Sequence, residues 1–427
     1  MKQFDYDTIP IADLPYGGLE AGLSDEERAI ADMIRGFATD VMRPLGQKLD
    51  RMTADEVAAE GSPVLGFLEQ MKALGMGIET LVTMPAGQMV RMFPLVQSIL
   101  GWGDAGLAIL AGASGFPATV AQLSGNAELI ERFGSCRGCW IGTQPDRGSD
   151  TTDLDGREKF PGRRHGKANL VARVTRDEVI LHGQTSAWVT GAPIAECGLA
   201  YIPADYGNGL YADDGTMRGA VVFVPFDEPG VSRGKPLEKL GQRPLPQGEV
   251  FFDEVRLPRR YLMSDDSAYR GKFFSAFTLA NMEMACVFAG VARAALDHAL
   301  AYVHEREQGG ALLIEHQSVR ARIFRIWQSS EAAFAIAQRC ANYNFLGNPH
   351  VLASITAKVT ATQHAVQAAD EALQLFGGYG LSREYPMEKL LRDARAATIE
   401  DGENHMLGLV AAGHLSQWFQ SSGLRGA

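Results

Sequence analysis

The hydrophobic period of this chain changes twice, and these changes limit the folds that it can adopt. Up to about residue 130, apolar side chains recur at helical spacing, starting after Ser24, which stands three residues before Glu27 as in a capping box. From about Trp140, short β-branched and aromatic runs such as NLVARVT and GAVVFVPF are separated by Gly, Pro, Asp and Asn. From about Phe273, the helical period returns in long segments with short connections.

This order predicts an α+β protein with three domains. We expect an N-terminal helical domain over residues 1–135, a middle antiparallel β domain over 136–262 and a C-terminal helical bundle over 263–427. The strands follow one another without intervening helices, and no GxGxxG motif is present. A Rossmann domain is therefore not expected.

The charge balance argues against some classes of function. The formal net charge is -11, whereas a non-specific nucleic-acid binder needs a basic face. No apolar run reaches the length of about 20 residues that a membrane span requires. The opening MKQFDYDTIPIADLPYGG is acidic and contains Pro, unlike a secretory signal or an Arg-rich transit peptide. We therefore expect a cytoplasmic location.

The cysteines are Cys136, Cys139, Cys197, Cys286 and Cys340. An odd number in a chain of this length indicates a reducing compartment rather than a disulfide framework. The first two form a CxxC, but no second pair or His cluster completes a zinc site. We expect a loop before a strand there, and no metal.

Special residues are most concentrated near the C-terminus, from Ala372 to Leu407. This stretch joins an apolar helix end, a glycine turn, an Arg/Asp/Arg run and the acidic cluster of Glu400, Asp401 and Glu403. Such a concentration predicts a functional site.

Six motifs occur in an ordered series along nearly the whole chain. They are WIGTQPDRGSD at 140–150, GQTSAWVTG at 183–191, KLGQR at 239–243, FFDEVRLP at 251–258, EREQGGALLIEHQSV at 305–319 and LQLFGGYGLSREYPMEKLLRDAR at 373–395. In this order they resemble the acyl-CoA dehydrogenase family of flavoproteins. The resemblance implies a β-barrel-like middle domain, a C-terminal four-helix bundle and an FAD between them.

The resemblance also implies a reaction. In this family a carboxylate removes the α proton of an acyl-CoA thioester while the β hydride passes to flavin N5, which gives an α,β-unsaturated thioester. An α-C–H is too weak an acid unless its enolate is stabilised, so the thioester carbonyl must accept hydrogen bonds. The family likeness further implies a homodimer or homotetramer that passes electrons to an electron-transfer flavoprotein.

Carried over by position, the family pattern implies three sets of FAD-binding residues. Those around the flavin are Trp140, Thr143, Ser149, Trp188 and Thr190, with Glu403 from the acidic cluster. Arg306 and Gln317 would meet the pyrophosphate and adenine end, and Gln374, Gly377 and Gly378 would approach the FAD of the neighbouring subunit. Arg392, Asp393 and Arg395 are expected to form structural ion pairs.

The expected catalytic base is Asp401, which stands where the family usually has Glu. An Asp side chain is one methylene shorter, which withdraws its carboxylate by roughly 1.5 Å. Some members take the base from the long helix after the β domain, at a position that is Ala280 here. Glu283 lies one helical turn further on and is a weaker candidate for the base, because we expect it on the helix surface. Glu400 is expected to point away from the site.

Other departures mark a divergent member. Gln144 replaces a Glu, Thr185 a Lys, Asn281 an Arg and Gly309 a Phe of the family pattern. Because Asp bases occur in the family with cyclic or otherwise unusual substrates, we expect a cyclic, branched or otherwise unusual acyl group.

Two alternatives remain open. A nitroalkane-oxidase-like flavin oxidase would act on a small non-CoA substrate, since Asp401, Gly402 and Asn404 reproduce three positions of an Asp-Gly-Gly-Asn context in that relative. A flavin-binding scaffold without turnover is the other. In addition, the basic segment over residues 155–167 is either a solvated loop or a site for the phosphates of CoA.

Overall fold

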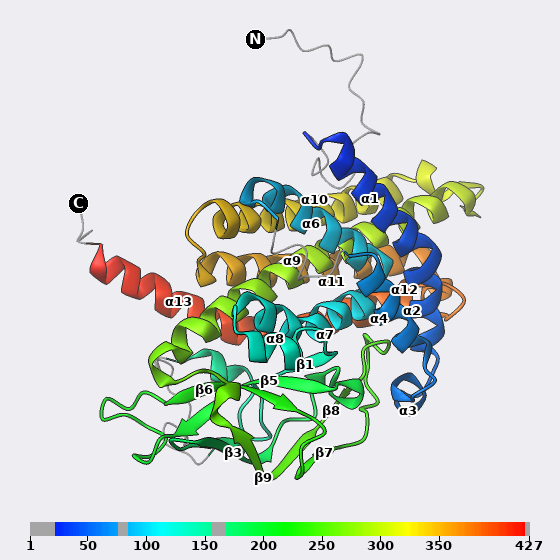
Figure 1. Cartoon of the computed structure of the whole chain (residues 1–427). Coiled ribbons are helices and arrows are strands. Elements are labelled where there is room, and N and C mark those ends of the chain that lie inside the picture. Colours follow the sequence, from blue (N-terminus) through cyan, green and yellow to red (C-terminus); the bar gives the residue numbers. More distant parts are fainter. Residues whose placement is uncertain (1–21, 76–83, 155–167, 423–427) are drawn as a thin grey trace.

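The computed structural model describes residues 22–75, 84–154 and 168–422. Helices form the N-terminal and C-terminal parts of the chain, and a curled sheet lies against one side of the helical layers (Figure 1). The expected α+β architecture is thus confirmed. The basic segment over residues 155–167 lies outside the described residues.

The N-terminal part is helical, as expected. Helix α1 (Asp25–Phe37) begins with the expected capping box, in which Ser24 and Glu27 exchange side-chain to backbone hydrogen bonds. A π-helical turn, Ala38–Met42, continues it into the next helix. The helices that follow are α2 (Arg43–Asp50), α3 (Ala54–Ala58), α4 (Pro63–Ala73), α6 (Ala86–Gly103), α7 (Ala105–Leu123) and α8 (Ala127–Phe133).

The middle part is a mixed sheet in the strand order β10-β6-β5-β2-β3-β9-β7, with β1 beside β5. Its strands are β1 (Gly138–Ile141), β2 (Val171–Val174), β3 (Glu178–Gln184), β5 (Cys197–Asp205), β6 (Gly219–Pro225), β7 (Val231–Arg233), β9 (Val250–Pro258) and β10 (Leu262–Ser264). A separate short ribbon pairs β4 (Val189–Thr190) with β8 (Gln247–Gly248). Most pairs are antiparallel, but β5 pairs parallel with both β1 and β2. The expected antiparallel pairing thus holds for most of the sheet but not for these two pairs, whose strands are far enough apart in the sequence for the long connections that parallel pairing requires.

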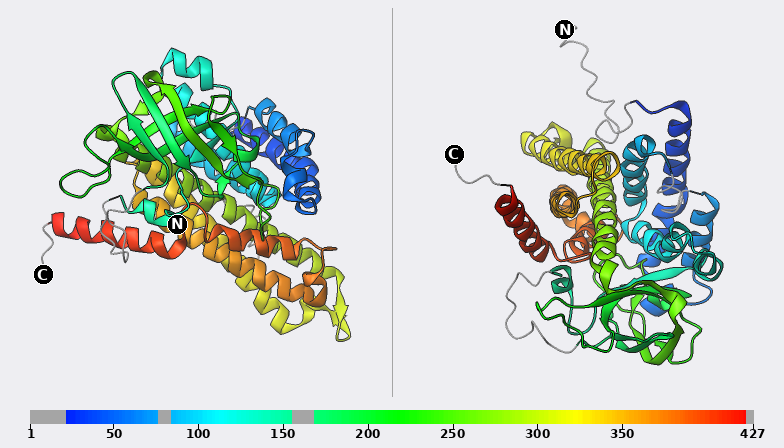
Figure 2. Two further views of the ribbon diagram at one scale, coloured as in Figure 1. Left: turned by 90° about the horizontal axis from the view of Figure 1, so that it is seen from below. Right: turned by 60° about the vertical axis from the view of Figure 1, so that its left-hand side comes forward.

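Three long helices dominate the C-terminal part: α9 (Asp266–Glu305), α10 (Gln317–Leu346) and α11 (Val351–Phe376). The hairpin of β11 (Glu307–Gln308) and β12 (Ala311–Leu312) joins α9 to α10 at the end of the bundle away from the sheet (Figure 2). Helix α12 (Met387–Ala397) packs on α11, and α13 (Asn404–Ser421) projects from the body (Figure 1).

The N-terminal helices and the bundle share one hydrophobic core, since α6 packs against both α9 and α10. Gly290 permits this contact, because a Cβ there would lie only 1.9 Å from the carbonyl oxygen of Ser98. A second core lies inside the β domain and includes the first turns of α13. By length and composition, α7 and α9 could each cross a membrane, but 56% and 72% of their apolar windows are buried inside the protein.

One expectation about the cysteines is wrong. Cys136 and Cys197 form a disulfide between the chain segment before β1 and the start of β5, whereas Cys139, Cys286 and Cys340 are free and buried. Sequence spacing could not indicate this bond, because its two residues are 61 positions apart and meet only through the β1–β5 pairing. Within the described residues, no group of three or more His, Cys, Asp or Glu could hold a metal ion.

Candidate active site

A cavity of about 1020 Å³ lies where the β domain, α7, α9 and the loop after α12 meet. The β domain contributes residues of the first two motifs, α7 and α9 contribute apolar side chains, and the loop contributes Glu400, Asp401 and Gly402. Segments that are far apart in the sequence therefore share one wall. We take this cavity as the candidate active site.

The β-domain wall combines aromatic rings and hydroxyl groups. Trp140, Thr143, Ser149, Trp188 and Thr190 all line the cavity, so all five residues expected around a flavin lie together. Trp188 is 60% exposed, which a core tryptophan would not be. The indole N–H of Trp140 is buried and has no hydrogen-bond partner in the described part of the chain. This wall thus offers both a flat apolar surface and a free donor.

Ser149 also connects this wall to the acidic loop. Its hydroxyl accepts a hydrogen bond of 2.8 Å from the backbone N–H of Glu403. The Glu403 carboxylate turns the other way, since it caps α13 by accepting from the N–H of Met406 at 3.0 Å. Glu403 therefore meets the cavity wall through its backbone, while its side chain starts a helix.

The backbone of the acidic loop is held in an unusual conformation at Asp401. Its φ of 46° lies in the left-handed region, which costs a non-glycine residue energy and needs support from its surroundings. The Asn281 amide on α9 supplies part of that support by donating to the Asp401 carbonyl at 3.3 Å. Lys358 on α11 holds the carbonyl of the next residue, Gly402.

Lys358 is fully buried beneath the acidic loop. Its ammonium donates to the carbonyl of Gly402 at 2.7 Å and to Oδ1 of Asn404 at 2.8 Å. Thr362, one turn along α11, accepts from Nδ2 of Asn404 at 3.0 Å and so orients that amide. Burial lowers the pKa of Lys358 to about 8, while Asp401, Glu400 and Glu403 favour its charged form.

Glu283, Glu400 and Asp401 are among the acidic residues that line the cavity, and their environments shift their pKa values by different amounts. Burial raises the pKa of Asp401, but the charge of Lys358 opposes that rise. Burial, with added repulsion from Asp401, raises the pKa of Glu283 to about 8. Burial also raises the pKa of Glu400 to about 7 against the charge of Lys239. Asp401 raises the pKa of Glu283, whereas Glu283 is not a cause of the shift at Asp401, so Asp401 loses its proton more readily than Glu283 does.

Glu283 does not lie on the helix surface where sequence reasoning placed it. It lines the cavity from α9, and its Oε1 lies so close to α7 that a Cβ on Gly112 would be 2.1 Å away. The expectation failed because α9 buries residues on all sides over much of its length, so position on a helical stripe does not decide exposure.

Glu400 does not point away either, which is a second correction. Its carboxylate lines the cavity and accepts a hydrogen bond from the side-chain amide of Gln242. Gln242 is buried at the cavity wall with a φ of 50°, and Lys239 lies nearby, bonded to Gln247 at 2.7 Å. The KLGQR motif therefore brings an amide and a cation to the acidic loop.

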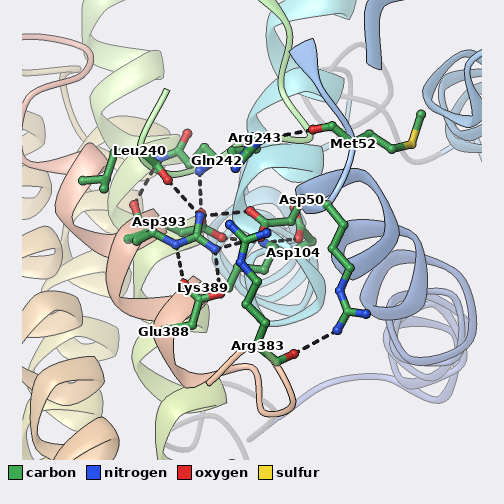
Figure 3. Close-up of polar contacts among 12 residues, drawn as sticks. Asp50, Met52, Asp104, Leu240, Gln242, Arg243, Arg383, Glu388, Lys389 and Asp393 are labelled. Carbon is green, nitrogen blue, oxygen red and sulfur yellow. Dashed lines mark hydrogen bonds and ion pairs between the residues drawn. The ribbon is translucent and has the colours of Figure 1, made fainter. Parts of the chain in front are cut away.

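A buried ion network holds this motif in place (Figure 3). Lys389 on α12 bridges Asp104 and Asp393 at 2.6 Å each, and Asp393 accepts from the backbone N–H of Gln242. Arg392 pairs with Asp50 at 2.7 Å and with Glu388.

Arg392 and Asp393 thus form the structural ion pairs that were expected. Arg395 instead lines the cavity and donates to Thr398. The network ties α2, α7 and α12 to one wall of the cavity.

The remaining expected cofactor residues form a second group outside the cavity. Arg306, Gln317, Gln374, Gly377 and Gly378 are exposed around the hairpin end of the bundle. Arg306 joins the two halves of this group, since its guanidinium lies 5.7 Å from the ring centre of Tyr379. Within one chain, the structure therefore does not bring the two sets of expected FAD-binding residues together.

Two departures from the family pattern have a local role. The buried Gln144 amide accepts from the N–H of Leu170 at 2.9 Å and donates to its carbonyl at 3.0 Å, as a paired strand would. The hydroxyl of Thr185 accepts from the N–H of Val250 at 2.9 Å.

Sequence reasoning missed Lys358, Gln242 and Lys239 as parts of this site. A signal existed for the first, because Lys358 is the one charged residue in the run ASITAKVTATQ.

Comparisons with known proteins give a consistent result. The family profile described as "Acyl-CoA dehydrogenase, C-terminal domain" matches residues 273–415. Benzylmalonyl-CoA dehydrogenase of Aromatoleum aromaticum is 29% identical over 93% of this chain and 100% of its own length. Cyclohexane-1-carbonyl-CoA dehydrogenase of Geobacter metallireducens is 30% identical over 59% of this chain and 65% of its own.

The fold has solved counterparts. A glutaryl-CoA dehydrogenase from Mycobacterium smegmatis in complex with FADH2 aligns with a TM-score of 0.75 and 19% identity. The alignment covers 94% of this chain and 97% of that one.

Proposed function

Because this chain belongs to the acyl-CoA dehydrogenase family, and is thus an FAD-dependent oxidoreductase of CH–CH bonds, we propose that it desaturates an unusual acyl-CoA with Asp401 as base. The observation that carries this proposal is that two carboxyl groups at one cavity have different surroundings: Lys358 favours the charged form of Asp401, whereas burial and the charge of Asp401 raise the pKa of Glu283 to about 8. A base and an acid with pKa values pushed apart are a common signature of proton transfer.

The residues present fit a flavin. An isoalloxazine ring is flat and apolar on its faces and carries hydrogen-bonding atoms along its edge. The indoles of Trp140 and Trp188 offer flat surfaces, the hydroxyls of Thr143 and Thr190 offer donors, and the unpartnered N–H of Trp140 lacks an acceptor. Bound FAD would supply the acceptor for the hydride that leaves the β carbon.

Proton removal falls to Asp401, whose carboxyl group reaches the cavity. Asn281 donates a hydrogen bond to the backbone carbonyl of Asp401, and Lys358 donates one to the carbonyl of Gly402. These two bonds hold the backbone of the loop that carries the Asp401 carboxyl group. A left-handed backbone at Asp401 redirects a side chain that is one methylene shorter than Glu. Burial raises the pKa of this carboxyl group, which makes it a stronger base, while the charge of Lys358 favours its ionised form.

The apolar part of the cavity fits the acyl group. Phe277, Leu279, Ala280 and Met284 on α9 face Ile109 and Phe116 on α7 across the cavity. Two relatives are named for a benzylmalonyl and a cyclohexane-carbonyl thioester, which are bulky acyl groups. A cyclic, branched or otherwise unusual acyl group is therefore our proposed substrate class.

We further propose that the active protein is a homodimer or homotetramer. The exposed group of Arg306, Gln317, Gln374, Gly377 and Gly378 would then meet the FAD held in the cavity of a second copy. Electrons would leave through an electron-transfer flavoprotein.

An anaerobic bleaching experiment tests the reaction class. The FAD-loaded protein is mixed with a panel of straight, branched and cyclic acyl-CoA thioesters and, separately, with small nitroalkanes, and the flavin absorption is followed. Bleaching by at least one thioester and by no nitroalkane is the expected result. Bleaching by nitroalkanes alone would replace the proposal with a nitroalkane-oxidase-like reaction, and no bleaching would indicate a scaffold without turnover.

A further inference from the structure

Glu283 is a buried carboxyl group without a protein partner at one of its oxygens. Oε1 has no hydrogen-bond partner in the described part of the chain, although the residue lines the cavity. A buried polar atom without a hydrogen-bond partner is costly, so such atoms are rare unless something binds them. The position of this one, at a substrate cavity, points to a ligand.

Apolar residues of α9 and α7 line the cavity beside Glu283. Ala280 and Met284 flank it on α9, and Ile109 and Ala113 line the facing wall on α7. The lack of a side chain at Gly112 leaves space for the carboxyl group, because a Cβ at that position would be 2.1 Å from Oε1 and 2.8 Å from Cδ of Glu283. The fold thus provides room for a carboxyl group between two apolar walls.

The carboxyl group is able to donate as well as accept. Burial, and then repulsion by Asp401, raises its pKa to about 8, so it is mostly protonated at neutral pH. No cation contributes to that pKa among the described residues. A neutral carboxylic acid presents one O–H donor and a carbonyl acceptor.

We propose that Glu283 is a specificity residue that hydrogen-bonds a neutral oxygen on the acyl group, so that the enzyme selects acyl-CoA thioesters carrying a hydroxyl or ketone group. The inference rests on the proposed function, because it concerns the acyl group bound at that site. A pure hydrocarbon acyl chain would leave Oε1 unpaired, whereas a hydroxyl or ketone oxygen would pair with the carboxyl group.

The charges around Glu283 favour a neutral oxygen over a carboxylate. The negative charge of Asp401 raises the pKa of Glu283 across the same cavity, and it would likewise repel an anionic acyl group. Lys358 directs two of its three N–H donors to Gly402 and Asn404 below the loop rather than to Glu283. A thioester with a second carboxylate is therefore disfavoured beside Glu283.

A site that hydrogen-bonds a polar group of its substrate strongly rejects an analogue that lacks this group. An apolar pocket rejects an analogue with an added polar group less strongly. From the usual cost of an unpaired buried group, we expect a preference of about tenfold to one-hundredfold for the oxygenated thioester.

The test compares cyclohexane-1-carbonyl-CoA with its 3-hydroxy and 4-hydroxy counterparts and with a ring dicarboxylic mono-thioester. Dissociation constants are measured by calorimetry in FAD-loaded Asp401→Asn, and again after adding Glu283→Leu, Glu283→Gln or Gly112→Ala. Glu283→Gln keeps a donor and an acceptor, and Gly112→Ala displaces the carboxyl group without removing it. Flavin bleaching by the same thioesters is recorded in parallel with Asp401 intact.

We expect one hydroxylated ring to bind about ten to one hundred times more tightly than the plain ring, and Glu283→Leu and Gly112→Ala to remove that preference. Glu283→Gln should retain it. A preference that is the same before and after Glu283→Leu would overturn the proposal, as would faster bleaching by the dicarboxylic thioester than by either hydroxylated ring in the protein with Asp401 intact. The preference is measured as binding, so it is tested separately from the desaturation reaction. If the proposed reaction is wrong, thioesters will bind without bleaching the flavin.

Discussion

Lys358 donates a hydrogen bond of 2.7 Å to the carbonyl oxygen of Gly402, the residue that follows Asp401. A fully buried ammonium thus lies under the loop that carries the proposed base, and it favours ionisation of the Asp401 carboxyl. This relationship makes Lys358 a positioning residue in our account.

Replacing Lys358 with Met should therefore change the pH dependence of flavin reduction. Without the cation, the pKa of Asp401 rises. As the pH is lowered, the rate of flavin reduction should therefore start to fall at a higher pH than it does in the wild type. Stopped-flow reduction between pH 5 and 9 measures the shift. Lys272→Met, on the exposed surface of α9, is the matched control and should leave the profile in place. A lower rate with an unshifted profile would mean that Lys358 is only structural.

Glu283 should make the fold less stable as the pH rises. Its pKa is raised from 4.5 to about 8, so the folded state holds this proton more tightly than the unfolded state does. The stabilisation from that proton is complete below about pH 4.5 and is lost as the pH rises toward 8. Urea unfolding at pH 5 and pH 8 should show a smaller loss of stability for Glu283→Gln than for the wild type. An identical loss in both proteins would show that Glu283 is not buried in the protonated form.

The ion network around Lys389 should be strongly stabilising as a unit. Removing this cation by Lys389→Met leaves Asp104 and Asp393 buried without their partner, which typically costs about 3–5 kcal/mol in the free energy of unfolding. The exposed pair of Arg256 and Glu178 provides the control, since Arg256→Met should cost less than about 1 kcal/mol. Denaturant unfolding distinguishes the two, and similar small losses would contradict the buried assignment.

Gly378 tests whether a second copy completes the cofactor site. Within one chain, a Cβ on Gly378 would meet nothing within 4 Å, so Gly378→Leu should leave the thermal stability of the FAD-free protein unchanged. If the FAD of a neighbouring subunit packs there, the variant should lose FAD during gel filtration while the wild type retains it. Light scattering on the same samples gives the oligomeric state. Full FAD retention in the variant would contradict the shared site.

Local sequence signals predicted much of the fold. The capping box at Ser24, the run of short strands after Trp140 and the long helical periods after Phe273 all depend on neighbouring residues, and each matches the structure. The parallel pairing of β5 with β1 and β2 depends on contacts across the chain, which periodicity does not record.

The same distinction applies to the site. The flavin-side residues from Trp140 to Thr190 follow from ordered motifs, and they meet at one cavity. The positions of Glu283 and Glu400 could not be predicted, because they depend on Gly112 and Gln242 from other elements. The bridge from Lys389 to Asp104 joins residues 285 positions apart, beyond the reach of any local pattern.

The most direct test of the central claim is anaerobic flavin reduction in Asp401→Asn. With a thioester that bleaches the wild type, we predict that this variant retains FAD but loses reduction by at least about a thousandfold, because it lacks the proposed base, and the pKa values of Glu283 and Glu400 are raised to about 8 and about 7. Asp253→Asn, on the exposed face of β9, should reduce at the wild-type rate. Reduction of Asp401→Asn at the wild-type rate would contradict the account and transfer the role of base to Glu283.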